Sequence, residues 1–169
     1  MSEDESDFRT VYEANYVAVL GYAMRRVPSD EAADVAADVF LTAWRRFPDV
    51  PRGAEARLWL YATARRVVAN RVRSERRRTR LRARLLREPA DPPQLAPERE
   101  PVGDAFGRLP AADREILSLV AWEGLSADEV ARVLGCSANA ARIRLHRARR
   151  RFAAELEREC PEPALGAAS

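Results

Sequence analysis

The chain has 169 residues, a net charge of +3, one histidine, two cysteines and 29 basic residues, all of which are arginine. This length fits one ordinary domain or two small ones, because domains begin at about 50 residues. Two cysteines and one histidine are too few for a zinc site, so we expect no metal and no cofactor. The chain opens with acidic residues, and no apolar stretch approaches the roughly 18 residues of a membrane span. These features favour a cytoplasmic protein.

Two amphipathic helices are expected first. Apolar residues recur at helical spacing over residues 8–27, and Pro28 ends the run. Ser29 has the side chain of a helix N-cap, and the two acidic residues after it suit the positive end of a helix. The second helix is expected to reach Arg46. Its predicted buried stripe comprises Ala32, Ala36, Val39, Phe40, Ala43, Trp44 and Phe47.

A long basic helix is expected after a loop at residues 48–53, which holds two prolines and a glycine. Residues 54–87 favour a helix that is apolar early and basic late. Between Arg65 and Arg87 there are eleven arginines and one acidic residue, Glu75. This excess indicates an anionic partner, because arginines that neutralise phosphates release condensed counterions. A merely solvated face would more often mix charges of both signs.

The composition changes at residues 88–101, which contain five prolines and almost no apolar side chain. Such a segment is typical of an extended linker. We therefore predict an all-α protein with two small helical domains, at residues 7–87 and 102–157, joined by a flexible linker at residues 88–101. In the second domain the helix should break at Leu109-Pro110 and resume over residues 111–122, with Gly124 as its stop and with Ile116, Leu117 and Val120 facing inward. The tail after Glu159 is expected to be disordered.

Residues 125–152 have the pattern of a helix-turn-helix. Ser126 and Glu129 fit a capping box, so a short helix should begin near Ala127. Gly135 lies where the chain must turn sharply, and Ser137 can cap the next helix. On that helix the buried face is expected at Ala141, Leu145, Ala148 and Phe152. The other face is basic, as in a helix that reads the DNA major groove rather than one that is merely solvated. Its candidate contact residues are Asn139, Arg142, Ile143, His146, Arg147 and Arg150.

Two pairs of residues allow more than one interpretation. Trp59 and Tyr61 could stack on unpaired bases, although aromatic residues at such positions more often belong to the core. Asp34 and Asp38 lie on one helix face and could form a paired-carboxylate or metal site. No histidine lies near them, so an exposed face for protein docking is the favoured interpretation. No nucleophile and carboxylate are placed to complete a triad with His146, and we do not expect an enzyme.

Taken together, these segments resemble the sigma-70 family of bacterial RNA polymerase sigma factors, in the short two-domain form called extracytoplasmic-function (ECF) sigma factors. The resemblance covers about residues 7–156. Its region 2.2 signature is the segment ADVAADVFLTAW at residues 33–44. Its most specific part is region 4, carried by Leu109-Pro110, Arg114-Glu115, Leu125-Ser126, Glu129-Val130-Ala131, Gly135-Cys136-Ser137 and residues 144–149.

The resemblance implies a transcription initiation factor that directs core RNA polymerase to promoters and helps to melt them. Polymerase binding, through the β′ clamp coiled coil, is implied for Asp34, Asp38 and Leu41. Contacts to the minus-10 single strand are implied for Arg52, Gly53, Trp59, Tyr61, Arg65, Arg66, Asn70 and Arg73. The basic face of the last helix would bind the minus-35 duplex, and the same domain would bind the polymerase β flap. The linker would cross the core near the RNA path, and an anti-sigma factor is an implied partner.

The sequence departs from the family pattern at two places. Arg66 stands where the family often has an asparagine, and Asn70 lies one turn later. The common Thr-Val-Lys-Ser of the recognition helix is Ala140-Ala141-Arg142-Ile143, so a base preference cannot be transferred. The alternatives are a dimeric helix-turn-helix regulator that acts without polymerase, which predicts symmetric half-sites, and a metal-dependent nucleic-acid enzyme built on Asp34 and Asp38.

Overall fold

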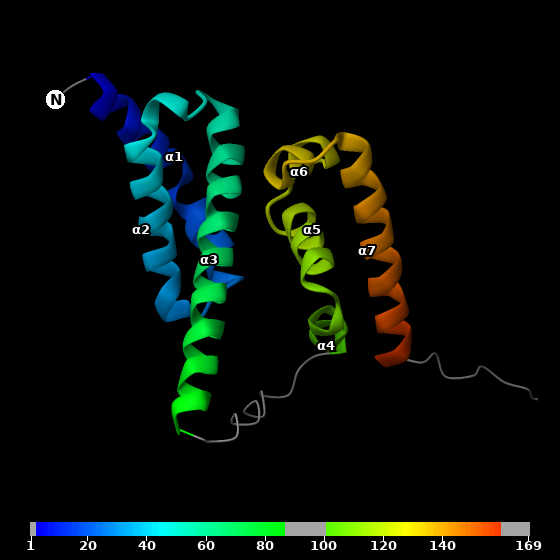
Figure 1. Cartoon of the computed structure of the whole chain (residues 1–169). Coiled ribbons are helices and arrows are strands. Elements are labelled where there is room, and N and C mark those ends of the chain that lie inside the picture. Colours follow the sequence, from blue (N-terminus) through cyan, green and yellow to red (C-terminus); the bar gives the residue numbers. More distant parts are fainter. Residues whose placement is uncertain (1–2, 87–100, 160–169) are drawn as a thin grey trace, which may run out of the picture. The chain divides into compact units, whose positions relative to one another are not determined.

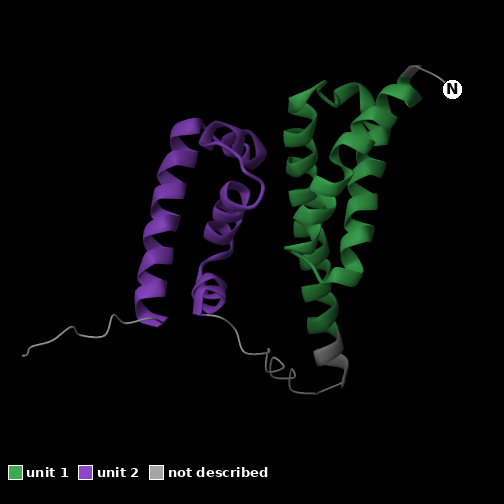
Figure 2. Cartoon of the chain, turned by 180° about the vertical axis from the view of Figure 1, so that it is seen from behind, with its two compact units in different colours: residues 1–90 green, residues 91–169 purple. Residues whose placement is uncertain are grey.

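The computed structural model describes residues 3–86 and 101–159, and the chain divides into two compact units at residues 1–90 and 91–169 (Figure 2). The described residues form helices and contain no strand, which confirms the all-α prediction with two helical units. The predicted linker lies outside the described residues except for Pro101, which begins a helix. The tail after Glu159 also lies outside them.

Unit 1 is built from three long helices (Figure 1). They are α1 (Glu3–Met24), α2 (Ser29–Arg45) and α3 (Ala54–Leu86), with a short 3-10 helix at Phe47–Asp49 before α3. All three helices pack against one another. The interior holds Val19 and Tyr22 of α1, Val35 and Val39 of α2, and Leu60 of α3, and each of these side chains is completely buried.

The start and the apolar stripe of α2 differ from the prediction. Ser29 is not the N-cap: the helix already includes it, and Pro28 occupies the cap position without a side-chain hydrogen bond. Val35 was absent from the predicted stripe but is fully buried. Trp44 was predicted to be buried but is 46% exposed, because it lies at the edge of an aromatic cluster, with its ring 5.0 Å from that of Phe8.

The second half of α3 leaves the three-helix core. A helix of 33 residues is about 50 Å long, which exceeds the length of α1 or α2. Figure 1 shows α3 continuing past the ends of both. Arg71 contacts Glu31 in the first turn of α2, and side chains from residue 72 to residue 81 are exposed except for the half-buried Ser74. This arginine-rich end is therefore held by no neighbouring helix of unit 1 among the described residues.

Unit 2 is a four-helix arrangement centred on its last helix. It comprises α4 (Pro101–Arg108), α5 (Ala111–Ala121), α6 (Ala127–Leu134) and α7 (Ala138–Glu159). The first three all pack on α7. The predicted break at Leu109-Pro110 is confirmed, and Gly124 lies beyond the end of α5 rather than capping it. Ile116 is buried as predicted, but the fully buried neighbour is Leu119, whereas Leu117 and Val120 are only half-buried.

Candidate functional site

The helix-turn-helix of unit 2 has the local geometry that its sequence predicts. The Ser126 side chain accepts a hydrogen bond from the Glu129 amide at 3.3 Å, and the Glu129 carboxylate accepts one from the Ser126 amide at 2.8 Å. This capping box starts α6 at Ala127. Gly135 ends α6 with φ 65° and ψ 42°, in the left-handed region that favours glycine. The Ser137 hydroxyl then accepts a hydrogen bond from the Ala140 amide at 3.2 Å, in the first turn of α7.

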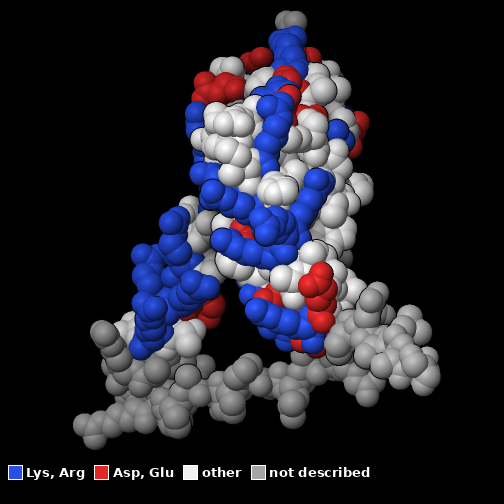
Figure 3. All heavy atoms as spheres, turned by 90° about the vertical axis from the view of Figure 1, so that its right-hand side faces the viewer, with Lys and Arg blue, Asp and Glu red and all other residues white. Residues whose placement is uncertain are grey.

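The exposed face of α7 presents all six residues predicted to contact the minus-35 duplex. At 100° per residue, these six side chains fall on an arc of about 140°. On the opposite side Ala141, Leu145 and Ala148 are buried as predicted, whereas Phe152, also predicted to be buried, is half-buried. Figure 3, seen from the side on which α7 lies in Figure 1, shows basic side chains along this helix. The surface therefore combines arginines with Asn139, Ile143 and His146, which suits contact with both phosphates and base edges.

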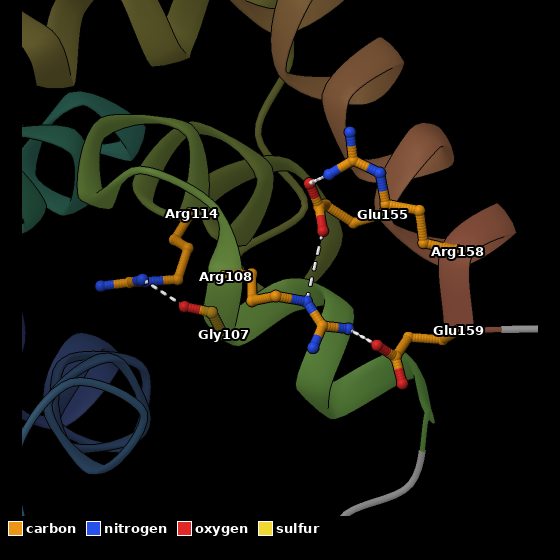
Figure 4. A network of polar contacts seen from close by, with 6 residues as sticks. All are labelled: Gly107, Arg108, Arg114, Glu155, Arg158 and Glu159. Atoms are coloured by element: carbon orange, nitrogen blue, oxygen red, sulfur yellow. Dashed lines mark hydrogen bonds and ion pairs between the residues drawn. The ribbon is translucent and has the colours of Figure 1, made fainter.

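Ion pairs that the sequence analysis did not identify attach α7 to the rest of unit 2. The buried Asp113 of α5 accepts a hydrogen bond from Arg151 at 2.6 Å. At the end of α4, Arg108 bonds to Glu155 at 3.2 Å and to Glu159, while Arg158 bonds to Glu155 at 2.8 Å (Figure 4). The spacing of 38 to 51 residues between the partners on different helices explains why no local pattern indicated them.

Arg114 secures the turn between α4 and α5. Its guanidinium donates to the carbonyl oxygen of Gly107 at 2.8 Å (Figure 4). It also donates to the carbonyl oxygen of Leu109 at 2.6 Å. These carbonyls are left without intrahelical partners by the break at Pro110. Arg114 belongs to α5 and thus supplies hydrogen-bond donors to carbonyl groups at and just beyond the end of α4.

The candidate polymerase-binding residues lie together on an exposed side of α2 that borders α3. The side chains of Asp34 and Asp38 are 73% and 54% exposed, and Leu41 is also exposed. With Asn70 and Arg71 of α3 they line an open groove of about 660 Å³ between the two helices. Arg71 lies 3.8 Å from the Asp34 carboxylate and 4.0 Å from that of Asp38. The groove therefore presents carboxylates around a central guanidinium and an apolar residue at its margin.

The eight candidate minus-10 residues do not form one surface. Trp59, Arg66, Asn70 and Arg73 recur at spacings of seven, four and three residues, which places them on one face of α3. Arg65 is exposed on a different side of the helix. The Asn70 side-chain oxygen accepts a hydrogen bond from Arg73, which joins two members of this face.

Tyr61 belongs to the core. Its side chain is 3% exposed, and its ring lies 5.5 Å from that of Tyr22. Of the two interpretations that the sequence left open for Tyr61, the structure has the core position, and stacking on an unpaired base would require the ring to leave the three-helix interior. Trp59 is only partly buried, and the guanidinium of Arg46 lies 6.0 Å from its ring centre.

Arg52 and Gly53 lie in the loop that leads into α3. Gly53 has φ 65°, and nothing lies within 4 Å of the position where a β-carbon would be. The Arg52 side chain is 91% exposed and lies 3.2 Å from the Asp7 carboxylate of α1. The loop and α1 enclose a small groove of about 330 Å³, lined by Asp7, Val50 and Arg52 among others.

Other kinds of site find no counterpart in the described residues. Within residues 3–86 and 101–159, no three His, Cys, Asp or Glu side chains gather where they could hold a metal ion. The same residues include no helix that is both long and apolar enough to cross a membrane.

Comparison with known proteins decides the family. Residues 11–78 match the family described as Sigma-70 region 2, and residues 99–152 match Sigma-70, region 4. The ECF RNA polymerase sigma factor SigD of Mycobacterium tuberculosis is 35% identical over 168 residues, which cover 90% of this chain and 78% of SigD. The chain belongs to the ECF group of the sigma-70 family. RNA polymerase sigma factor CnrH of Cupriavidus metallidurans is 30% identical over 149 residues, which cover 78% of this sigma factor and 76% of CnrH.

Solved structures agree with this assignment. CnrH in complex with the cytosolic domain of CnrY matches 89% of this sigma factor and 88% of the CnrH chain, with a TM-score of 0.62 and 28% identity. The sigma factor RpoE of Bartonella quintana, in complex with the anti-sigma factor NepR, matches 89% and 97% with a TM-score of 0.61. Its 22% identity supports the fold alone. Unit 1 thus corresponds to region 2, and the helix-turn-helix of unit 2 to region 4.

Proposed function

We propose that this sigma factor divides promoter-directed transcription initiation between its two units: unit 1 binds core RNA polymerase and the minus-10 element, and unit 2 binds the minus-35 duplex. The observation that carries the proposal is the α7 face, where all six candidate contact residues are exposed beside a complete capping box and a left-handed glycine turn. A helix-turn-helix of this kind places its second helix in the major groove.

The polymerase-binding surface is the groove between α2 and α3. Asp34, Asp38 and Leu41 lie on one exposed side of α2, and their carboxylates would meet basic side chains of the β′ clamp coiled coil. Exposed Leu41 would add apolar contact, since interfaces combine an apolar centre with a polar rim. The protein contributes no catalytic group in this account, and it acts in the cytoplasm, where bacterial RNA polymerase works.

The minus-10 surface is the face of α3 formed by Trp59, Arg66, Asn70 and Arg73, with Arg65 at its side and Arg52 and Gly53 in the preceding loop. Asn70 also lines the α2–α3 groove, so the two proposed surfaces meet at this residue. Arginines there neutralise backbone phosphates, and Trp59 offers a ring for stacking on an unpaired base. The groove between the loop and α1 is the candidate place for a base that has left the duplex. Tyr61 is excluded from this surface because it is buried.

Two further partners follow from the family. Unit 2 would also contact the polymerase β flap. CnrH and RpoE were solved with the cytosolic domain of CnrY and with the anti-sigma factor NepR, respectively, and we propose that an anti-sigma factor also restrains this chain.

The test is a run-off transcription assay with purified core polymerase and linear promoter fragments. The proposal predicts transcripts from a fragment with minus-35 and minus-10 elements only when the sigma factor is added. Tight binding to a symmetric operator in the absence of core, without any transcript, would instead indicate a stand-alone regulator. Cleavage of DNA that depends on a divalent metal would indicate an enzyme.

A further inference from the structure

One ion pair joins the two helices of the helix-turn-helix across their exposed side. The Arg142 guanidinium, through Nη2, donates a hydrogen bond to Oδ1 of Asp128 at 2.7 Å. Asp128 lies in the first turn of α6 and Arg142 in the second turn of α7. Both side chains remain more than half exposed, at 62% and 58%. The contact is therefore on the surface that faces DNA in the proposed function and is not part of the core.

Arg142 is the one candidate contact residue that is held in this way. In the part of the chain that the structure describes, Asn139, Ile143, His146, Arg147 and Arg150 have no hydrogen bond or ion pair from their side chains. On the arc of the recognition face, Arg142 and Arg147 occupy opposite edges. Asp128 thus holds one edge of the face, at Arg142, while among the described residues Arg147 at the other edge has no such partner.

The carboxylate of Asp128 is not needed to start its own helix. Ser126 and Glu129 form the capping box that satisfies the first amides of α6. An acidic residue in the first turn interacts favourably with the helix dipole, but this requires no particular partner on α7. The Asp128 carboxylate, which points toward Arg142, can therefore have a role other than helix capping.

A guanidinium held by a carboxylate behaves differently from one that is free. Arginine carries five N–H donors, so one bond to Asp128 leaves donors for the paired acceptors of a guanine edge. Holding the group in one direction lowers the entropy lost on binding. The negative charge also opposes a shift of Arg142 onto a nearby phosphate, and such a repulsive element raises specificity rather than affinity.

We propose that Asp128 is a specificity-determining positioning residue: it orients Arg142 for base recognition in the minus-35 groove and discourages sequence-independent phosphate contact by that arginine. This inference rests on the proposed function and deepens it. Asp128 itself needs to touch no base.

The experiment compares holoenzymes made from core polymerase and the full-length wild type, Asp128→Ala, Arg142→Ala or the double variant. Run-off transcription is measured on promoters in which each minus-35 base pair is substituted in turn, in competition with the parent promoter. Asp128→Asn keeps the size of the side chain and provides a second variant. Glu157→Ala removes an exposed carboxylate near the end of α7 in the same unit and serves as the matched control.

Arg142→Ala should abolish discrimination at the base pairs that Arg142 reads. Asp128→Ala should weaken discrimination at those same base pairs by about twofold to fivefold, the range expected of an exposed ion pair. It should also raise the affinity of the holoenzyme for DNA without a promoter. In the Arg142→Ala background, removing the Asp128 carboxylate should have no further effect on discrimination. Glu157→Ala should match wild type.

The proposal is overturned if Asp128→Ala and Asp128→Asn lower transcription from all promoters by one common factor, or alter discrimination equally with and without Arg142. A wild-type holoenzyme that starts at no promoter would instead refute the proposed function itself, and the inference with it.

Discussion

Asp38 and Arg147 represent two proposed kinds of contact on separate units. Asp38 of unit 1 is proposed to bind core polymerase, and Arg147 of unit 2 is proposed to bind minus-35 DNA. Asp38 lies in the α2–α3 groove, and Arg147 lies at one edge of the recognition face of α7. Their side chains are exposed, so substitution is expected to change binding more than folding. The two residues therefore test the division of labour one contact at a time.

Replacing Arg147 with alanine should reduce transcription from minus-35-dependent promoters by about tenfold, because an arginine bonded to a base edge contributes about 1–3 kcal/mol. Association with core, measured by gel filtration or fluorescence anisotropy, should stay at the wild-type level. Arg144→Ala, an exposed arginine of α7 outside the six-residue recognition face, is the matched control. An equal loss of core binding in Arg147→Ala would contradict the assignment.

Replacing Asp38 with arginine should have the opposite effect. The new guanidinium would face Arg71, whose Nη2 lies 4.0 Å from the Asp38 carboxylate, and would repel a basic partner. Affinity for core should fall while unit 2 still binds minus-35 DNA. Asp30→Arg reverses a charge in the first turn of α2 outside the groove and should leave core binding intact. Core binding that survives Asp38→Arg would remove this residue from the interface.

Asp113 carries a structural prediction. It is a buried carboxylate bonded to Arg151 at 2.6 Å, and Asp113→Ala would remove the tie between α5 and α7. Because Arg151 remains about half exposed, its charge keeps contact with water, and we expect a loss of about 1–3 kcal/mol in the free energy of unfolding. Urea unfolding of the full chain measures this loss. A stability equal to wild type would show that the ion pair contributes nothing.

At the scale of the helix and the turn, the sequence predicted best those features that depend on interactions between residues close together in the chain. The capping box of Ser126 and Glu129, the turn at Gly135 and the cap at Ser137 depend on residues three or four positions apart, and all three are confirmed. Helical periodicity alone predicted the buried face of α7 at Ala141, Leu145, Ala148 and Phe152, and the first three are buried while Phe152 is half-buried.

The sequence was insufficient where a neighbouring helix decides the outcome. For Tyr61 it left open both stacking on a base and burial in the core, and the ring of Tyr22 from α1, which packs against Tyr61, decides for the core. Trp44 continues the apolar stripe of α2, yet the stripe reaches the margin of the bundle there and half of the side chain stays in solvent. The ties of α7 to Asp113 and Arg108 join residues far apart in sequence. These contacts depend on how whole helices pack against one another. The sequence of a single helix does not contain that information.

Two glycines give a prediction at the scale of the turn. Gly135 ends α6 at φ 65°, where a β-carbon is strained by about 1–2 kcal/mol even though nothing lies within 4 Å of it. Gly103 lies inside α4, and a β-carbon there would also stand in open space. Its substitution by alanine should stabilise the helix by about 0.5–1 kcal/mol. Gly135→Ala should therefore lower the urea midpoint of unfolding and Gly103→Ala should raise it. Shifts of the same sign would show that backbone conformation does not control these two positions.

The free end of α3 gives a prediction at the scale of the helix. Arg76 and Arg80 lie one turn apart beyond the three-helix core, and both are exposed. If they bind phosphates upstream of the minus-10 element, replacing both with alanine should weaken promoter binding by the holoenzyme. The slope of log affinity against log salt should become shallower by about one for each phosphate that is no longer neutralised. An unchanged slope would show that this end of α3 does not touch DNA.

For the whole molecule, family membership and geometry lead to one functional picture. The net charge is only +3, but arginines concentrate on α3 and α7, the helices that carry the two proposed DNA surfaces. Three of the acidic residues that line the groove, Glu31, Asp34 and Asp38, lie on α2, where a different partner is proposed. Such local differences in charge, rather than the total, allow one small chain to bind both a polymerase and its promoter.

The central claim is that one chain contacts both promoter elements at once while it is bound to core. It is tested most directly by run-off transcription from a promoter series in which base pairs are inserted between the minus-35 and minus-10 elements. Insertion of about five base pairs, half of a helical turn, should abolish the transcript, because it turns the minus-35 groove away from α7. Transcription that is equally strong at every spacing, with the minus-35 sequence still required, would contradict the account.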